Sequence, residues 1–507
     1  MAATSVGAGI LISRLAGLLR VRLTSKYFGL ESDAVDAFNA AFRIPNLLQN
    51  LFGEGALSGS FIPVYSALRA RGEDVAAART ARTFFALLSS AIAVLVLAGV
   101  LAAPLVTDLL VPGFSGAKRD LTVRLVRILF PGAGLLVASA WCLAVLNSHG
   151  KFLLSYTAPV AWNTAMIGCL LTFGRTHDLA QLAVYLGWAS VAGSFLQLAV
   201  QWPSAWRLSR HDGTLGMGDP VRQIGRNFVP VTISRGAVQI TAYIDQYIAS
   251  WLPTGAVTGL FNAQLLYTLP VSLFGVSISA AQLPALSGDA TREGLEPFRA
   301  RINASLPRLA FFIVPSAVAF VVLGDVIAAA VLQTGRFRVQ DSEYVWGILA
   351  GSAIGLLATT MARLYSVAHY ALGDTKRPLQ FAAIRLIAAG ALGYVGALLV
   401  PAWLGLAPKW GAVGLTGSAG VAGWIEFALL RASLNRRIGH TGLAPSYLIR
   451  LWIAGAVAAP VAFATKLALP PLHPVLRGGV VLPVFGVIFL GLALLLRLPI
   501  PGLRRRY

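Results

Sequence analysis

The chain has 507 residues, of which 57% are hydrophobic and only 12% are charged, and its mean hydropathy is +0.72. Soluble domains carry about 25% charged residues, so this composition excludes an ordinary soluble protein and indicates a polytopic membrane protein. The net charge of +21 does not indicate nucleic-acid binding, because the basic residues stand in short connections between apolar segments and no glycine-rich phosphate loop accompanies them.

Apolar runs of about 20 residues predict membrane-spanning helices. The expected fold is therefore all-α, with fourteen transmembrane helices, the second of which is expected to be broken at Pro45. The spans lie near 4–25, 34–66, 84–110, 122–147, 153–174, 179–202, 227–251, 256–286, 306–333, 343–372, 379–401, 410–433, 448–469 and 475–498.

Three further features of the sequence concern its orientation in the membrane, its N-terminus and its cysteines. Lys and Arg gather in the even-numbered connections and at the C-terminus, so the positive-inside rule places both termini in the cytoplasm. The apolar N-terminus runs directly into the first span, and no cleavable signal sequence is expected. Cys142 and Cys169 lie in apolar runs without metal-ligand spacing, so we expect small core residues and no metal site.

An internal repeat divides the chain. Five matches follow one another at an offset of about 222 residues: Ile12-Ser13-Arg14 with Ile233-Ser234-Arg235, Phe38-Asn39-Ala40 with Phe261-Asn262-Ala263, Leu51-Phe52-Gly53 with Leu273-Phe274-Gly275, Pro63 with Pro284, and Ser66 with Ser287. Six spans separate the copies, so both have the same orientation and are related by a pseudo-two-fold axis along the membrane normal. We expect an N-terminal lobe at 1–210, a C-terminal lobe at 211–440, and two extra helices with a basic cytoplasmic tail at 441–507.

The first two spans carry charged residues whose burial in hydrocarbon costs free energy. A charge at a helix centre costs about 2.5–3.5 kcal/mol on insertion scales, so it normally faces a partner or a water-filled cavity. Arg14 and Arg20 stand six residues apart, which places them at two depths and on different faces of one helix. They fit the lining of a wide cavity; the alternative is that Arg20, like Arg22, extends its guanidinium to the interface.

Acidic residues in the spans have two interpretations each. Asp36 stands near the outer end of the second span and fits either a binding site or a helix end. Glu54 lies between Gly53 and Gly55, which favours a functional or gating role over an ion pair with an arginine. Asp245 suits coupling to Na⁺ or H⁺, and a structural hydrogen bond explains it equally well.

An arginine-lined cavity implies an anionic ligand, because the planar, forked guanidinium matches phosphate oxygens. A pyrophosphate-linked substrate fits this chemistry. Composition alone does not separate a lipid phosphate from a soluble organic anion. Arg363, Arg385 and Glu426 are further charges in the spans, without an assigned role.

The order of several motifs resembles the MurJ/MviN family of lipid II flippases. The motifs cover about three quarters of the chain, and the N-terminal block is the most specific. They are Ser13-Arg14-Leu15-Ala16-Gly17-Leu18-Leu19-Arg20, Asp36-Ala37-Phe38, Ile44-Pro45-Asn46-Leu47-Leu48, Gly53-Glu54-Gly55-Ala56-Leu57-Ser58, Phe61-Ile62-Pro63-Val64, Pro112-Gly113-Phe114, Ala158-Pro159-Val160 with Asn163, Gly335 and Phe337 with Asp341, and Gly373-Asp374-Thr375-Lys376 with Pro378.

The resemblance implies a transporter of the multidrug/oligosaccharidyl-lipid/polysaccharide exporter superfamily in the bacterial inner membrane. Two six-helix lobes would enclose a cavity that flips lipid II outward by alternating access for cell-wall synthesis, and the last two helices would offer a groove for the polyprenyl tail. The substrate-binding residues that the resemblance implies in this sequence are Arg14, Arg20, Asp36, Gln49, Glu54 and Gln264. No cofactor is implied; cell-wall synthases are candidate partners, and a membrane potential or ion gradient would bias the cycle.

Three positions depart from the family pattern. Gln49 and Gln264 stand where arginines are usual, and Tyr267 stands where an acid is frequent. Glutamine donates hydrogen bonds to phosphate but adds no charge. The alternatives are therefore a flippase for another polyprenyl-pyrophosphate-linked glycan, an ion-coupled small-molecule antiporter, or a scaffold that does not transport. An enzyme is disfavoured, because the loops contain no paired-acid metal motif and no catalytic domain.

Overall fold

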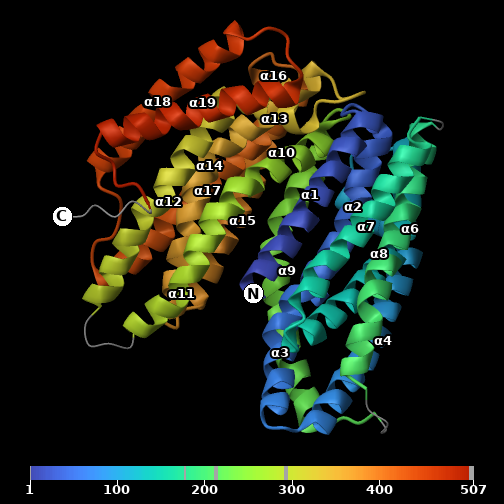
Figure 1. Ribbon diagram of the computed structural model, residues 1–507. Helices are drawn as coiled ribbons and strands as arrows, with labels where there is room; N and C mark the ends of the chain where they lie inside the picture. Colours follow the sequence, from blue (N-terminus) through green and yellow to red (C-terminus); the bar gives the residue numbers. More distant parts are fainter. Residues whose placement is uncertain (1, 176–177, 211–214, 291–294, 502–507) are drawn as a thin grey trace. The chain divides into compact units, whose positions relative to one another are not determined.

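The computed structural model describes residues 2–175, 178–210, 215–290 and 295–501, and these residues form helices and connections without a strand (Figure 1). The chain divides into two compact units. The first comprises Met1–Val257 with Thr334–Phe337, and the second comprises Thr258–Gln333 with Arg338–Tyr507. The all-α prediction is confirmed.

The first unit is built around one long apolar helix, α6. It packs against α2, α3, α4 and α8, while α1 packs against α7 and α3 against α9. Trp141 of α6 is fully buried, and Phe42 and Phe61 join it in the core of this unit. The helices are α1 (Ala2–Phe28), α2 (Asp33–Phe52), α3 (Glu54–Ala70), α4 (Asp74–Leu101), α5 (Ala103–Leu110), α6 (Gly116–Ser148), α7 (Phe152–Phe173), α8 (Leu179–Leu208) and α9 (Asp219–Ala249).

The second unit is built around α14, which packs against α11, α12, α13 and α17. The last two helices, α18 and α19, pack on each other and reach α12 and α13 respectively. The elements are α10 (Ala256–Pro270), the π-helix η1 (Val271–Val276), α11 (Ser277–Ala290), α12 (Glu296–Val322), α13 (Gly324–Leu332), α14 (Val339–Ala371), α15 (Lys376–Tyr394), the π-helix η2 (Val395–Leu399), α16 (Val400–Trp403), the 3₁₀-helix η3 (Pro408–Trp410), α17 (Gly411–Ile438), α18 (Pro445–Ala468) and α19 (Pro474–Leu495).

Each of the fourteen expected spans falls on helical structure. Within the described residues, ten helices are long and apolar enough to cross a membrane. The expected spans outside this set lie on α1, α2 with α3, α7 and α9. The count of fourteen therefore stays a prediction. The lobe boundaries also stay a prediction, and the first compact unit extends past residue 210 to include α9.

The predicted break at Pro45 is wrong. Helix α2 runs through Pro45 and ends at Phe52, and the interruption lies at Gly53, which has non-helical φ −92° and ψ −135°. A proline costs one backbone hydrogen bond, yet packing of a buried helix can hold it in place. Gly53 is required for a different reason: a Cβ there would lie 2.2 Å from the Gln49 carbonyl oxygen.

The second copy of the repeat is interrupted at the matching residue. Leu51-Phe52-Gly53 corresponds to Leu273-Phe274-Gly275, and Gly275 lies in the π-helix η1. A Cβ on Gly275 would lie 2.8 Å from the Thr360 methyl carbon of α14. Both copies thus leave regular α-helical geometry at a matching glycine. Single π-helical turns such as η1 frequently occur at functional sites.

Close packing of α14 on α17 gives a first prediction. A Cβ on Gly355 would lie 2.4 Å from the Gly420 Cα, whereas a Cβ on Gly417 would lie 3.6 Å from the nearest side-chain atom. Gly355→Ala is expected to destabilise the protein by about 1–3 kcal/mol through overpacking. Gly417→Ala, the matched control, should be neutral or slightly stabilising. Thermal unfolding in detergent measures both; equal midpoints would contradict the close contact.

A second prediction concerns His149, in the connection after α6. Its Nε2 lies 2.9 Å from the Tyr65 hydroxyl. Burial, followed by the positive charges of Arg69 and Lys151, lowers the pKa of His149 from 6.5 to about 4. Between these pH values the unfolded chain binds a proton that the folded protein does not, so stability should fall as the pH drops from about 6.5 to about 4. His149→Gln should show a smaller loss of melting temperature between pH 7.5 and pH 5 than the wild type.

Candidate functional site

Arg20 of α1 lies among aromatic and sulfur-containing side chains. Its guanidinium carbon is 5.1 Å from the centre of the Phe42 ring and 5.0 Å from that of Trp162, and these two rings stack on each other. Nη1 contacts the Met166 sulfur at 3.6 Å, and Nε is buried without a hydrogen bond to any described residue. Among the described residues no carboxylate pairs with Arg20. Ring faces and a sulfur, and no described carboxylate, therefore hold this partly buried cation.

Arg14 lies about two turns before Arg20, and its side chain is exposed. No ionic partner for it occurs in the part of the chain that the structure describes. Between the two arginines, α1 approaches α7 closely: a Cβ on Gly17 would lie 4.0 Å from Oδ1 of Asn163, a buried acceptor that no described residue satisfies. Helix α1 thus carries two cations without a described carboxylate partner, beside a polar position of α7.

Asp36 of α2 is buried and already paired. It is 1% exposed, its Oδ2 lies 2.9 Å from Nζ of Lys118, and it accepts a 2.9 Å hydrogen bond from the backbone N–H of Gly255. Asp33 shares the same lysine at 3.1 Å. The structure therefore gives Asp36 a connecting function between α2, α6 and the α9–α10 connection, and a contact with substrate stays a prediction.

The other predicted residues of the first unit lie on three different helices. Gln49 is half-buried on α2. Glu54 begins α3, and its side chain lies outside the described residues. Asp245 of α9 lies within electrostatic range of Arg43.

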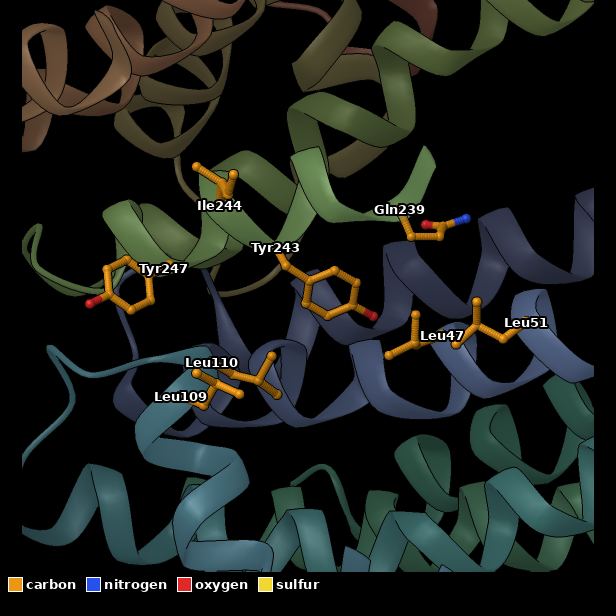
Figure 2. A pocket seen from close by; sticks show the side chains of 8 residues that line it. All are labelled: Leu47, Leu51, Leu109, Leu110, Gln239, Tyr243, Ile244 and Tyr247. Carbon is orange, nitrogen blue, oxygen red and sulfur yellow. The ribbon is translucent and has the colours of Figure 1, made fainter. Parts of the chain in front are cut away.

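Arg43 joins α2 to α9. Its Nη1 donates to the Ala242 carbonyl at 2.6 Å, and the Tyr243 hydroxyl donates to the Arg43 carbonyl at 3.2 Å. Beside this contact is an apolar cavity of about 470 Å³ (Figure 2). It is lined by Leu47 and Leu51 of α2, Leu109 and Leu110 of α5, and Gln239, Tyr243, Ile244 and Tyr247 of α9.

In the second unit, Gln264 of α10 is exposed, and its Nε2 lies 3.4 Å from the Thr268 hydroxyl. One turn away, the Tyr267 hydroxyl lies 2.8 Å from that of Thr359 on α14. Arg385 and Arg363 are within electrostatic range of Tyr267. This face of α10 therefore meets hydrogen-bonding groups and positive charge.

The two arginines beside Tyr267 differ in pairing. Arg385 Nη1 lies 3.1 Å from Oε2 of Glu426, whose side chain is only 10% exposed. Arg363 is exposed, and among the described residues no carboxylate pairs with it. An unpaired guanidinium in a membrane-spanning helix requires water or an anion beside it. Arg363 is thus a candidate binding residue.

Sequence reasoning missed two of these features. Lys118 was recognisable only as a cation near the start of a span, because its carboxylate partners lie more than eighty residues away in the chain. Arg363 carries a usable signal, an arginine within an apolar run. Nothing in the sequence indicates that it lies within electrostatic range of Tyr267 while Arg385 pairs with Glu426.

Known proteins resemble this chain over most of its length. The family described as Lipid II flippase MurJ matches residues 24–473. A probable lipid II flippase MurJ of Bdellovibrio bacteriovorus is 33% identical over 454 residues, which is 88% of this chain and 83% of the relative. The Lipid II flippase MurJ of Burkholderia cenocepacia is 30% identical over 449 residues, which is 85% of this chain and 83% of that protein.

Solved structures resemble the fold. Lipid II flippase MurJ in an inward closed conformation has a TM-score of 0.79 at 22% identity, covering 97% of this chain and 98% of that one. An inward-facing multidrug resistance MATE family transporter of the MOP superfamily has a TM-score of 0.66 at 17% identity, covering 86% and 98%. With the family match across 24–473 and relatives at 30% identity or more, the chain belongs to the MurJ family of multi-span membrane proteins.

Proposed function

We propose that this protein is a lipid II flippase, which carries the lipid-linked peptidoglycan precursor from the cytoplasmic to the periplasmic leaflet by alternating access. Membership of the MurJ family supports this function, and the named relatives are lipid II flippases. The bacterial inner membrane is the corresponding location, with both termini in the cytoplasm. The protein acts as a transporter and not as an enzyme.

The observation that carries the proposal is the state of the arginines on α1. Among the described residues, Arg20 rests on the rings of Phe42 and Trp162 without a carboxylate, and Arg14 is exposed without one. Leaving such cations uncompensated in a membrane-spanning helix costs free energy. A pyrophosphate headgroup would offset that cost with charge-assisted, bidentate hydrogen bonds.

The remaining residues fall into supporting functions. Gln49 and Gln264 would donate hydrogen bonds to the headgroup. Glu54 would have a functional or gating role at the interruption between α2 and α3. Asp245, next to Arg43, would carry Na⁺ or H⁺ if transport is ion-coupled. Cell-wall synthases are the natural partners, because they consume the flipped lipid.

The test is whether this chain rescues bacteria depleted of their own lipid II flippase. Growth should be restored, and lipid II should become accessible to a periplasmic degrading enzyme. Arg20→Met at equal expression is the negative control. Failure of the wild type to rescue, with normal insertion, would reject lipid II as the substrate.

A second candidate follows from Gln49 and Gln264, which replace the usual arginines. A less cationic cavity would suit a polyprenyl-pyrophosphate lipid with a different glycan. Rescue of a strain that lacks another glycan-lipid flippase, without rescue of the lipid II defect, would favour this candidate.

A further inference from the structure

Helix α8 fixes the position of the Trp162 indole. Trp162 Nε1 donates to the Ser190 carbonyl oxygen at 3.0 Å and to the Ser190 hydroxyl at 3.3 Å. The same carbonyl accepts a 2.8 Å hydrogen bond from the hydroxyl of Ser194, and both serines are buried. An indole has a single N–H donor, so its attachment to Ser190 selects one orientation of the ring.

A glycine of α8 lets α7 approach closely enough for this hydrogen bond. A Cβ on Gly193 would lie 2.8 Å from Cδ1 of the Trp162 ring, 2.8 Å from the Trp162 carbonyl oxygen and 3.0 Å from its Cα. Separations this short are overpacked, so any larger residue at position 193 would displace Trp162. Gly193 therefore sets the distance between the two helices at the ring.

Phe42 of α2 completes the support for Arg20. Its ring stacks on Trp162 with 5.6 Å between the ring centres, and Phe38 stacks on Phe42 in turn at 5.2 Å. Phe42 is 2% exposed, so the core of the first unit holds it. The Arg20 guanidinium carbon lies 5.0 Å from the centre of the Trp162 ring and 5.1 Å from that of Phe42. We call the pair of rings, Phe42 and Trp162, the aromatic seat.

The aromatic seat restrains the guanidinium without occupying it with strong hydrogen bonds. Ring faces attract a cation through their quadrupole. The described contact of Nη1 is with the Met166 sulfur at 3.6 Å, and a thioether is only a weak acceptor. Nε makes no hydrogen bond within the described part of the chain. A phosphate oxygen is a much stronger acceptor, so it can replace the sulfur.

The restraint matters because an arginine side chain is long and flexible. Without the aromatic seat, Arg20 could extend its guanidinium toward the membrane interface. A ligand that captures a free side chain must first immobilise it, and the lost entropy amounts to about two- to tenfold in affinity. A guanidinium that is already held avoids this loss.

We propose that Trp162 is a positioning residue, which holds the Arg20 guanidinium in the orientation that binds the pyrophosphate of the transported lipid. Arg20 makes the contact, and Trp162 acts only through Arg20. Ser190 and Gly193 of α8 fix Trp162 in turn. This inference rests on the proposed function in one respect, that the ligand is a polyprenyl pyrophosphate. It is independent of the glycan.

Two variants at position 162 separate the ring from its hydrogen bond. The probe is farnesyl pyrophosphate, titrated into the full-length protein in nanodiscs. Trp162→Leu removes the ring and should weaken binding about five- to tenfold. Trp162→Phe keeps a ring face and should retain most of the affinity, within about threefold of the wild type.

The thermal midpoints show whether Trp162 has a merely structural role. Both variants lose the hydrogen bond to Ser190, so both midpoints should fall. The affinity should nevertheless fall clearly only in Trp162→Leu. Equal affinities of Trp162→Leu and Trp162→Phe, or wild-type affinity in Trp162→Leu, would overturn the proposal.

A spectroscopic signature tests the link between Trp162 and Arg20. In protein that contains fluorinated tryptophan, the fluorine resonance of Trp162 is assigned by its loss in Trp162→Phe. Farnesyl pyrophosphate should shift this resonance in the wild type, because the cation over the ring gains an anion. The shift should be absent in Arg20→Met. A wild-type resonance that does not respond to the bound probe would overturn the proposal.

A substitution on α8 tests the support of the ring from a distance. Gly193→Ala alters neither the aromatic seat nor Arg20, yet it should displace Trp162 and weaken probe binding about threefold or more. Gly168→Ala is the matched control, because a Cβ there meets no atom within 4 Å, and its affinity should be unchanged. Equal affinities of the two variants would overturn the role of α8. If Gly193→Ala does not fold, the two variants at position 162 decide.

The outcomes separate this inference from the proposed function. A wild type that does not bind farnesyl pyrophosphate would reject both. A wild type that binds the probe but does not rescue flippase-depleted bacteria would reject lipid II alone, and the variants would still test Trp162. If the wild type and Trp162→Leu bind the probe equally, the inference alone is rejected.

Discussion

Replacing Arg20 with methionine is expected to abolish lipid II transport while the protein stays inserted and at least as stable as the wild type. The guanidinium has ring faces and a sulfur as neighbours and no carboxylate among the described residues. A methionine fills similar space without the desolvation cost of a charge. Function should therefore fall more than about 100-fold, while the thermal midpoint stays level or rises.

The opposite stability result would identify a structural residue. If Arg20 chiefly fastened α1 to α2 and α7 through its rings, its loss would remove about 0.5–2 kcal/mol per cation–π contact and lower the midpoint. Arg20→Lys keeps the charge but loses the planar fork, and it should retain partial transport. Arg127→Met, an exposed arginine of α6, is the matched control and should transport within about twofold of the wild type.

Much of the fold was predictable because the bilayer imposes a simple rule on sequence. Each membrane-spanning helix must satisfy its own backbone, so apolar length alone locates it. All fourteen expected segments fall on helices for this reason. Helix interruptions are harder to predict. Pro45 stays inside α2 and the helix is interrupted at Gly53, because packing of a buried helix outweighs the tendency of proline to end a helix.

The site was less predictable because it depends on partners far away in the chain. The sequence identifies Arg20 as an intramembrane cation, but its neighbours Trp162 and Met166 belong to α7. For Asp36, the sequence suggested a function but did not reveal its ionic partner. Its position in a family motif suggested a ligand contact, whereas the structure pairs it with Lys118 of α6. Charge type is readable from sequence, and charge pairing is not.

The glutamines that replace family arginines illustrate how a neighbouring helix can supply missing charge. Gln264 brings no positive charge to α10, but Arg363 of α14 lies within electrostatic range of Tyr267 on the same helix. Arg385 is also close, and its charge is largely balanced by Glu426 at 3.1 Å. Arg363 is consequently the better candidate for headgroup contact in the second unit. The protein would then bind an anion with a differently placed set of cations.

Replacing Arg363 with glutamine should accordingly weaken lipid II binding at least tenfold, about 1.4 kcal/mol, because the headgroup loses a charge-assisted hydrogen bond. Arg308→Gln is the matched control: Arg308 is another exposed arginine of the second unit, near the start of the expected ninth span, and its loss should change binding less than about twofold. Titration of lipid II into purified protein in nanodiscs measures both.

Lysine at position 363 separates charge from geometry. Arg363→Lys should recover part of the affinity, because an ammonium attracts phosphate as a point charge but cannot form a bidentate contact. Wild-type affinity in Arg363→Gln would show that this arginine serves the fold or faces only water. Weakened binding of a short polyprenyl pyrophosphate without sugars, in parallel with lipid II, would locate the contact at the pyrophosphate. A loss of affinity for lipid II alone would instead locate the contact of Arg363 at the glycan.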